Sequence, residues 1–187
     1  MAALMAALVA AMLAQASDRT PWAVAILADR FRRPAAILFA AAFAFAIVNT
    51  IGAVAGMLIA PRITPEARTL FLALALANAG LMALFPIKRP DPKGRRSGAF
   101  LVSLFALLAF GLGDRTQFLT AAIAARGSTP FFAAAGATLG SLAIAIPATL
   151  AGERAYIRLP HLPIRIAIGL LFVLDALWTA LGALRLI

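Results

Sequence analysis

The sequence contains no cysteine and only one histidine, and both absences narrow the chemistry that is possible. Without thiols the chain forms no disulfide and no thiolate metal centre. His161 falls between two prolines in a stretch expected to be a loop, so an imidazole-based metal site inside the helices is not expected either. The sequence also lacks an HExxH motif and a paired nucleophile and base. We therefore expect neither a resident cofactor nor an enzyme.

Charge is scarce as well. Charged residues make up 13% of the 187 residues and hydrophobic residues 64%, whereas a soluble domain of this size needs more charge to cover its surface. The formal net charge of +10 is typical of proteins that bind nucleic acid or anionic lipid. However, no soluble domain remains to carry a nucleic-acid interface. The lipid bilayer is the expected partner.

Apolar stretches long enough to cross a bilayer as helices recur along the chain. Proline and clustered charge separate them. The sequence predicts an all-α integral membrane protein of six transmembrane helices, at approximately 2–28, 35–60, 67–86, 98–125, 130–151 and 164–186.

Lys and Arg are distributed unevenly between the two sides of this predicted bundle. The loops after the first, third and fifth helices hold eleven of them, and the opposite side holds four. The positive-inside rule then predicts that both termini lie outside and that the central loop is cytoplasmic. The alanine-rich composition favours a bacterial inner membrane. Cleavage of the first helix as a signal peptide after Ala16 is an alternative, but no basic residue precedes that helix.

The two halves of the chain align without a gap when one is shifted by 96 residues. In this register Asp18-Arg19-Thr20 falls on Asp114-Arg115-Thr116, and Arg30, Pro34 and Gly56 each fall on an identical residue. Each unit has three predicted spans, so the second copy enters the membrane upside down. The predicted organisation is two inverted three-helix repeats, 1–86 and 98–187, joined by a short basic cytoplasmic linker, 87–97. Secondary transporters use such repeats, with the site between them near the midplane.

The repeated tripeptides place charge about halfway along two helices. Each such charge costs roughly 2.5–3.5 kcal/mol on insertion scales, so pairing or water has to offset it. Sequence neighbours point about 100° apart on a helix. The two-fold repeat instead predicts cross pairs, Asp18 with Arg115 and Asp114 with Arg19. Two such pairs that only lock the halves together are one interpretation.

The other interpretation is a site for a hard cation. In it the carboxylates of Asp18 and Asp114 line a water-filled cavity and bind calcium, magnesium or manganese, which favour oxygen ligands. Pro21 and Ser17 predict a break in the first helix that frees backbone carbonyls. The side chains close enough in sequence to add neutral oxygens are Gln15, Thr20, Thr116 and Gln117.

Three other polar residues lie inside the predicted spans, namely Asn49, Asn78 and Asp175. Asp175 has Ala79 opposite it in the repeat. It neutralises Arg19 or Arg115, takes part in proton transfer, or stays protonated without a role. The small residues around Gly136 and Gly140 are interpreted as close helix contacts.

These motifs resemble those of the Gdt, or transmembrane protein 165, family of divalent cation/proton exchangers. The hallmark of that family is E-x-G-D-(K/R)-(T/S), once in each three-helix half. The second copy here reads Gly111-Leu112-Gly113-Asp114-Arg115-Thr116, and the first reads Gln15-Ala16-Ser17-Asp18-Arg19-Thr20. The resemblance covers essentially the whole chain. It implies exchange of manganese or calcium for protons, with an inorganic cation and the proton as the transported partners.

The chain departs from the family motif at the two glutamates, where it has Gln15 and Gly111, and Ser17 replaces the first glycine. With Arg19 and Arg115 nearby, the formal charge of the motifs is about zero, so a divalent ion is expected to be held more weakly. Two other functions stay open. One is transport of a different small solute, such as a monovalent cation or an organic ion, and the other is a non-transporting membrane paralogue.

Restoring both glutamates tests whether the altered motifs weaken cation binding. We expect a Gln15→Glu, Gly111→Glu double variant to transport divalent cations at least about tenfold better at low concentration, because each carboxylate adds a charged ligand. Uptake of manganese or calcium into vesicles measures it. Unchanged uptake would contradict this explanation of the altered motifs.

Overall fold

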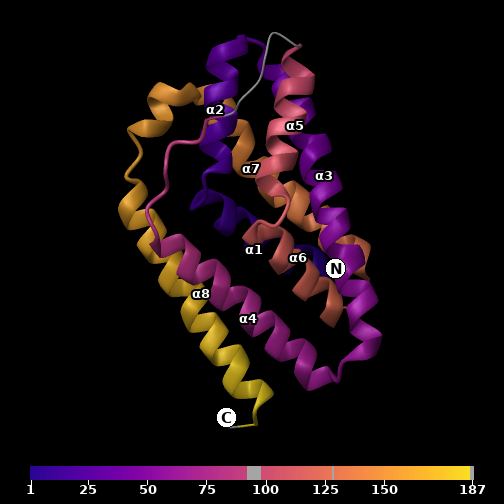
Figure 1. The fold of residues 1–187 in the computed structure, drawn as a ribbon. Coiled ribbons are helices and arrows are strands. Elements are labelled where there is room, and N and C mark those ends of the chain that lie inside the picture. Colours follow the sequence, from indigo (N-terminus) through magenta and orange to yellow (C-terminus); the bar gives the residue numbers. More distant parts are fainter. Residues whose placement is uncertain (92–97, 128, 186–187) are drawn as a thin grey trace.

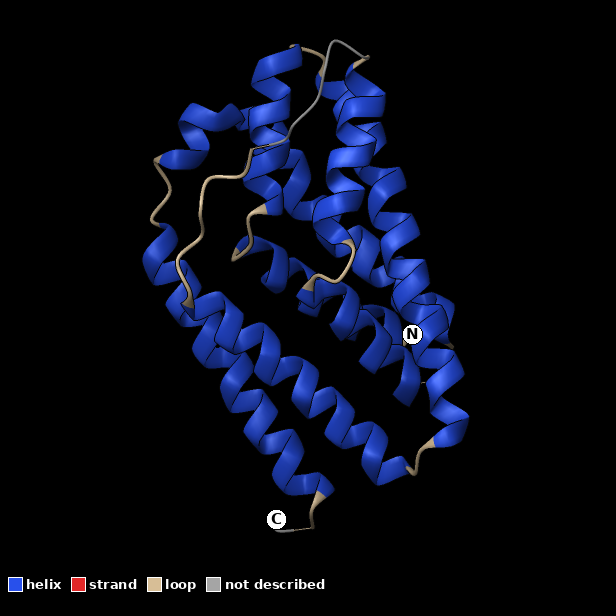
Figure 2. Cartoon of the chain, viewed as in Figure 1, coloured by secondary structure: helices blue, strands red, loops and turns tan. Residues whose placement is uncertain are grey.

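The computed structural model describes residues 1–91, 98–127 and 129–185, and the regular structure within them is entirely helical (Figure 2). Each half begins with two short helices and continues with two long ones (Figure 1). The first half contains α1 (Ala2–Ala16), α2 (Thr20–Phe31), α3 (Pro34–Ile59), the short 3₁₀ helix η1 (Ala60–Arg62) and α4 (Pro65–Leu84). The second half contains α5 (Ala99–Gly111), α6 (Arg115–Arg126), α7 (Pro130–Ile157) and α8 (His161–Ala183).

The helix boundaries follow the internal repeat. The long helices α3 and α4 start at Pro34 and Pro65, and their counterparts α7 and α8 start 96 residues later, at Pro130 and His161. Proline is favourable in the first turn of a helix because its missing N–H would have no partner there. The interruptions of the two short pairs also correspond, because Asp18 and Asp114 both lie between the short helices.

The six continuous spans predicted from the sequence are not all present. Four helices, α3, α4, α7 and α8, are long and apolar enough to cross a membrane, and α5 with α6 makes a fifth span if this pair, bent by 64°, is counted as one. The first predicted span is also interrupted, as the Ser17 and Pro21 positions indicate, and leaves α1 with only 15 residues. Within the described residues, the structure therefore has four or five candidate spans.

The predicted boundaries near the end of the chain differ in outcome. The predicted end of the fifth span at residue 151 coincides with a kink, because Gly152 is non-helical at φ 72° and ψ 176°, and helical structure then continues to Ile157. His161, predicted to lie in a loop, is the first residue of α8. The predicted end of the last span, at residue 186, lies outside the described residues.

The two halves interlock. The short helices of each half pack on a long helix of the other, α1 and α2 on α7, and α5 and α6 on α3. Helices α3 and α7 pack antiparallel, since Ile37 clusters with Ala145 at one end and Ala53 with Ala134 at the other. Helices α4 and α8 also lie side by side (Figure 1) and run antiparallel. These pairs have the inverted relation expected of the repeats.

Close helix contacts depend on glycine. A Cβ atom at Gly136 on α7 would lie 2.1 Å from the Leu4 carbonyl oxygen of α1, and one at Gly140 would lie 2.2 Å from that of Leu8. Gly56 on α3 approaches the Ala121 carbonyl of α6 in the same way, at 2.1 Å. Small residues let helix backbones approach this closely in membranes. The predicted contact role of Gly136 and Gly140 is confirmed.

The chain after α4 is fastened to the second half. Arg165, a buried residue of α8, donates hydrogen bonds to the carbonyls of Ala83 (3.0 Å) and Phe85. Arg89 forms a 2.7 Å ion pair with Glu153, whose backbone N–H donates to Asp29 of α2. Three of the five basic residues of the predicted linker, Lys93, Arg95 and Arg96, lie outside the described residues.

The close approach of α1 to α7 generates a stability prediction. We expect Gly136→Val to lower the stability of the protein by about 2 kcal/mol or more, because the added side chain has to push α1 away from α7. Thermal unfolding in detergent measures it. Gly182→Val is the matched control, since nothing lies within 4 Å of a Cβ at that position. Equal losses in both variants would contradict the packing role.

Candidate functional site

The two helix interruptions meet at a cavity of about 500 Å³. Its lining includes both motif aspartates, so the repeat brings together two side chains that are 96 residues apart. Arg19, Gly113 and Lys88, which also line it, are exposed, so the cavity is not sealed inside the protein. The lining residues are Ser17, Asp18, Arg19, Asn78, Met82, Phe85, Pro86, Ile87, Lys88, Gly113, Asp114 and Arg115.

Each aspartate holds the backbone at its own interruption. The Asp18 carboxylate accepts hydrogen bonds from the Thr20 hydroxyl (2.6 Å) and backbone N–H (3.2 Å). Asp114 is the N-cap of α6 and accepts from the backbone N–H of Thr116 at 3.3 Å. Such caps satisfy N–H groups that have no partner within the helix, and the positive end of the helix dipole favours a carboxylate there. Gly113, at φ 78°, provides the left-handed backbone that turns the chain out of α5.

Asp18 pairs with the other half of the protein. Its carboxylate lies 3.4 Å from the Arg115 guanidinium, and the two side chains are only 14% and 5% exposed. The predicted cross pair between Asp18 and Arg115 is therefore present. Breaking a buried pair is costly because one charge is left without compensation.

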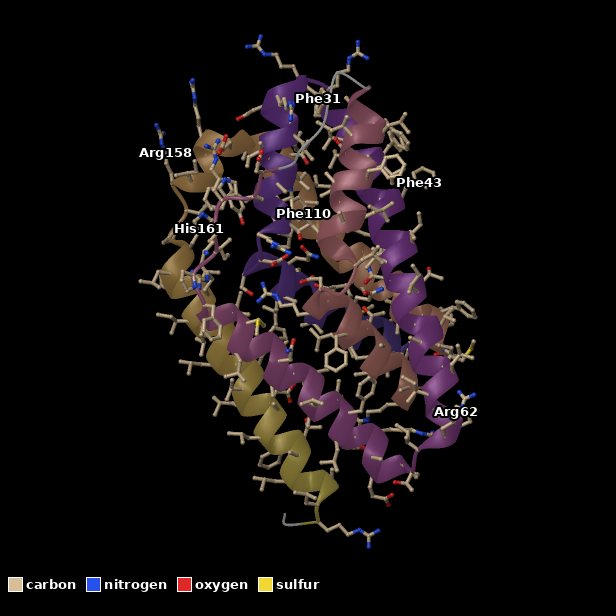
Figure 3. The ribbon with its side chains drawn as sticks, in the orientation of Figure 1. Phe31, Phe43, Arg62, Phe110, Arg158 and His161 are labelled. Atoms are coloured by element: carbon tan, nitrogen blue, oxygen red, sulfur yellow. The ribbon has the colours of Figure 1, made fainter. Side chains whose placement is uncertain are left out.

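The second predicted cross pair, between Asp114 and Arg19, is absent from the described residues. Arg19 is exposed, and its guanidinium lies 5.3 Å from the ring centroid of Phe110 on α5. Figure 3 shows Phe110 in the middle of the bundle. A cation–π contact stabilises the arginine without neutralising Asp114. In the part of the chain that is described, Asp114 accepts backbone hydrogen bonds but has no ion-pair partner.

The predicted neutral ligands are mostly engaged with the protein. Gln15 is buried, does not line the cavity, and donates from Nε2 to the Thr116 hydroxyl at 3.4 Å. Its Oε1 is buried without a hydrogen-bond partner in the described structure. Thr20 and Thr116 are also buried and do not line the cavity. Gln117 accepts from the Gly113 N–H at 2.7 Å and donates to the Val48 carbonyl at 3.2 Å, so both ends of its amide are used.

A second cavity, of about 440 Å³, lies on the other side of Asp114, between α3, α4 and α6. It adjoins the first cavity, because both are lined by Asn78, Gly113, Asp114 and Arg115. Asn78, on α4, is the shared residue that does not belong to the α5–α6 interruption. Gln117 lines this second cavity only.

Asp175 lies apart from this arrangement. It is an exposed residue of α8, lines neither cavity, and has no ion pair among the described residues, so it does not neutralise Arg19 or Arg115 in this structure. Nowhere in residues 1–91, 98–127 and 129–185 do three His, Asp or Glu side chains gather. A cation in the first cavity would therefore meet two carboxylates.

Sequence reasoning missed part of the cavity wall. Asn78 was recognised as a polar residue within a span but was not assigned to the site. Phe85 and Pro86 were assigned to the end of the third predicted span, and Ile87 and Lys88 to the linker, although all four line the first cavity. A polar side chain within an apolar helix was the available signal for Asn78, and Pro86 with its charged neighbours gave no comparable signal.

Comparison with known proteins identifies the family of the chain. The family model described as divalent cation/proton antiporter GDT1 matches residues 3–91 and 99–186, which is nearly the whole chain in two halves. The chain belongs to the GDT1 family. Membership makes it a multi-pass membrane protein of a transporter family, not an enzyme, and its family exchanges divalent cations for protons.

A relative of the chain has a more specific name. The chain is 28% identical over 170 residues to a Vibrio cholerae protein named "Putative manganese exporter", an alignment that covers 90% of this chain and 85% of that protein. No solved structure was found to match.

The two positions that depart from the GDT1 motif have different surroundings. Gln15 is buried beside Thr116, whereas a Cβ at Gly111 would lie 3.1 Å from the Val48 side chain. Glutamate at 111 therefore has to displace Val48, and Gln15→Glu is the milder change.

The Asp18–Arg115 pair generates a second stability prediction. We expect Asp18→Asn to destabilise the protein by about 3 kcal/mol, because Arg115 is then buried without a counter-charge. Thermal unfolding of Asp18→Asn, Arg115→Gln and the double variant measures the coupling, and the double variant should lose less than the sum of the single ones. Asp175→Asn is the matched control on an exposed aspartate. A similar loss in both aspartate variants would refute the pairing.

Proposed function

We propose that this chain exchanges a divalent cation, manganese, for protons, and that Asp114 and Asp18 provide the carboxylates of the site. The observation that carries the proposal is the cavity of about 500 Å³ that both aspartates line, at the point where the helix interruptions of the two repeats meet. Membership of the GDT1 family supports the reaction, and the name of the Vibrio cholerae relative supports manganese and export. Manganese favours oxygen ligands of this kind.

The two aspartates have different roles in this proposal. Asp18 is held by Arg115 and by Thr20, so its charge is largely committed to the protein. Asp114 has no ion pair in the described structure, and we assign it the exchange step, in which the carboxylate releases its proton when the cation binds and takes one up when the cation leaves. The C-terminal ends of α1 and α5 also face the interruptions, and the partial negative charge there favours a cation.

Orientation and span number belong to the same proposal. We place both termini outside and the linker in the cytoplasm, with each broken pair, α1–α2 and α5–α6, counted as one span, which gives six. Phe85 to Lys88 then bring the cytoplasmic side of the protein to the cavity wall. The cation enters from the cytoplasm, and rocking of the interlocked halves exposes the site to the other side.

A second candidate function is transport of a monovalent cation or a small organic ion. The observation that favours it is the charge of the cavity, whose lining includes three basic residues and two acidic ones, namely Arg19, Lys88, Arg115, Asp18 and Asp114. A divalent cation is repelled by the basic groups unless Arg115 stays bound to Asp18 and Arg19 stays on Phe110.

Everted membrane vesicles test the proposed exchange. With the lumen acidified by respiration, we expect added manganese to drive proton efflux and raise the luminal pH, and we expect an Asp18→Asn, Asp114→Asn double variant to abolish this response. A pH-sensitive fluorescent dye in the lumen measures it, and Asp175→Asn is the control. Identical traces for the wild-type and double-variant proteins would exclude these carboxylates, and a response only to other solutes would support the second candidate.

A further inference from the structure

Asn78 is a polar residue in an apolar stretch of α4, and its side chain lies at the candidate site. It lies in the second half of α4, a helix of 20 residues, and it lines both cavities together with Asp114 and Arg115. In the described part of the chain its side-chain amide has no hydrogen bond. The side chain is half-buried, so its amide is open to the cavity and is free to bind what enters it. In a cavity that reaches Asp114, the partner of the amide is water or a ligand.

The other neutral oxygens near the carboxylates are already bonded or, like that of Gln15, lie outside the lining of both cavities. Thr20 donates its hydroxyl to Asp18 at 2.6 Å, and Gln117 uses both ends of its amide on backbone groups. Thr116 accepts from Gln15, and neither residue lines either cavity. Among the neutral side-chain amides that line the two cavities, Asn78 is the one whose oxygen is not already bonded in the described structure.

Asn78 also differs from its counterpart in the repeat. The equivalent position in the second half is Leu174, which is 66% exposed on the outer surface of α8. The helices correspond, yet α4 packs on α6 beside the Asp114 interruption, whereas α8 has no comparable contact with α2. The repeat therefore supplies one such asparagine and not two. Asn78 lies next to the interruption that contains Asp114, the aspartate without an ion pair in the described structure.

From these contacts we infer that the side-chain amide oxygen of Asn78 is a ligand of the transported cation, which it binds together with the carboxylate of Asp114. The inference rests on the proposed function. It assigns to α4 a ligand that lies outside both copies of the repeated motif. A hard divalent cation takes amide oxygens as readily as it takes water, and it gains a fixed ligand by doing so. Asn78 then helps to set the affinity of the site, whereas the carboxylates supply its charge.

Asn49 offers a matched control. It is also an asparagine inside a span of the first half, but it lies on α3, is 2% exposed and lines neither cavity. Its amide accepts from the Thr120 hydroxyl at 3.2 Å and donates to the Thr138 hydroxyl at 3.4 Å. Replacing Asn49 removes helix contacts and leaves the cation site intact. Replacing Asn78 removes the ligand and breaks no hydrogen bond within the described structure.

The experiment measures binding and transport separately. Manganese binding to purified protein in detergent is followed by electron paramagnetic resonance of the free ion, and the manganese dependence of proton efflux is followed in everted vesicles. We expect Asn78→Ala to raise both the Kd and the KM for manganese about tenfold or more, since the bond between the amide oxygen and the charged cation is lost. We expect Asn78→Asp to lower the Kd, because it adds a charge. Asn49→Ala should leave both constants unchanged in the protein that remains folded.

The outcomes distinguish the ligand role of Asn78 from the proposed exchange of manganese for protons. If the wild-type protein binds and exchanges manganese but Asn78→Ala has the same constants as Asn49→Ala, the ligand role of Asn78 is wrong and the proposed function stands. If the wild-type protein neither binds nor exchanges a divalent cation, both are wrong. A raised Kd in Asn78→Ala together with a lowered Kd in Asn78→Asp supports the inference. If Asn78 only packed against its neighbours, replacing it by aspartate would not tighten manganese binding.

Discussion

Two helices are interrupted in the middle of an apolar bundle, and the rest of the structure depends on how these interruptions are satisfied. Lipid offers no hydrogen bonds, so free backbone groups and charges at that depth have to find partners within the protein or in water. Asp114 caps the helix that follows it, and Asp18 accepts hydrogen bonds from Thr20 at the start of α2. The charge on Asp18 is balanced by an arginine from the opposite half. The halves therefore cannot be separated without leaving a buried charge uncompensated.

The two repeats have the same arrangement of helices, but the side chains of their motifs make different contacts, and these differences determine the chemistry of the site. Arg115 turns inward to Asp18, whereas Arg19, its counterpart, stacks on Phe110. Asp114 is consequently the less restrained of the two carboxylates. A symmetric pair of ion bridges would join the halves and leave no charge for a cation. The observed arrangement keeps one bridge for cohesion and one acidic group that faces a cavity.

Much of this architecture could be predicted from residue types alone. Apolar length and proline positions gave the long helices, the 96-residue register gave the repeat, and the Ser17–Asp18 sequence indicated the first interruption. The interruption in the second half was not anticipated, because Gly111, Leu112 and Gly113 are tolerated within a membrane helix and break it only when Gly113 adopts a positive φ. Asn78 was not assigned to the site for a different reason. Helices that are apolar on every side do not indicate which side faces the interior.

Two contacts between the halves have no counterpart in the repeat. Arg165 binds the end of α4, and Asp29 holds the backbone beyond the Gly152 kink in α7. In the repeat these residues correspond to Thr69 and Ala125, which offer no such charge. Asp29 belongs to the first half and Arg165 to the second, so a pairing of either half with itself would lack one of these two contacts.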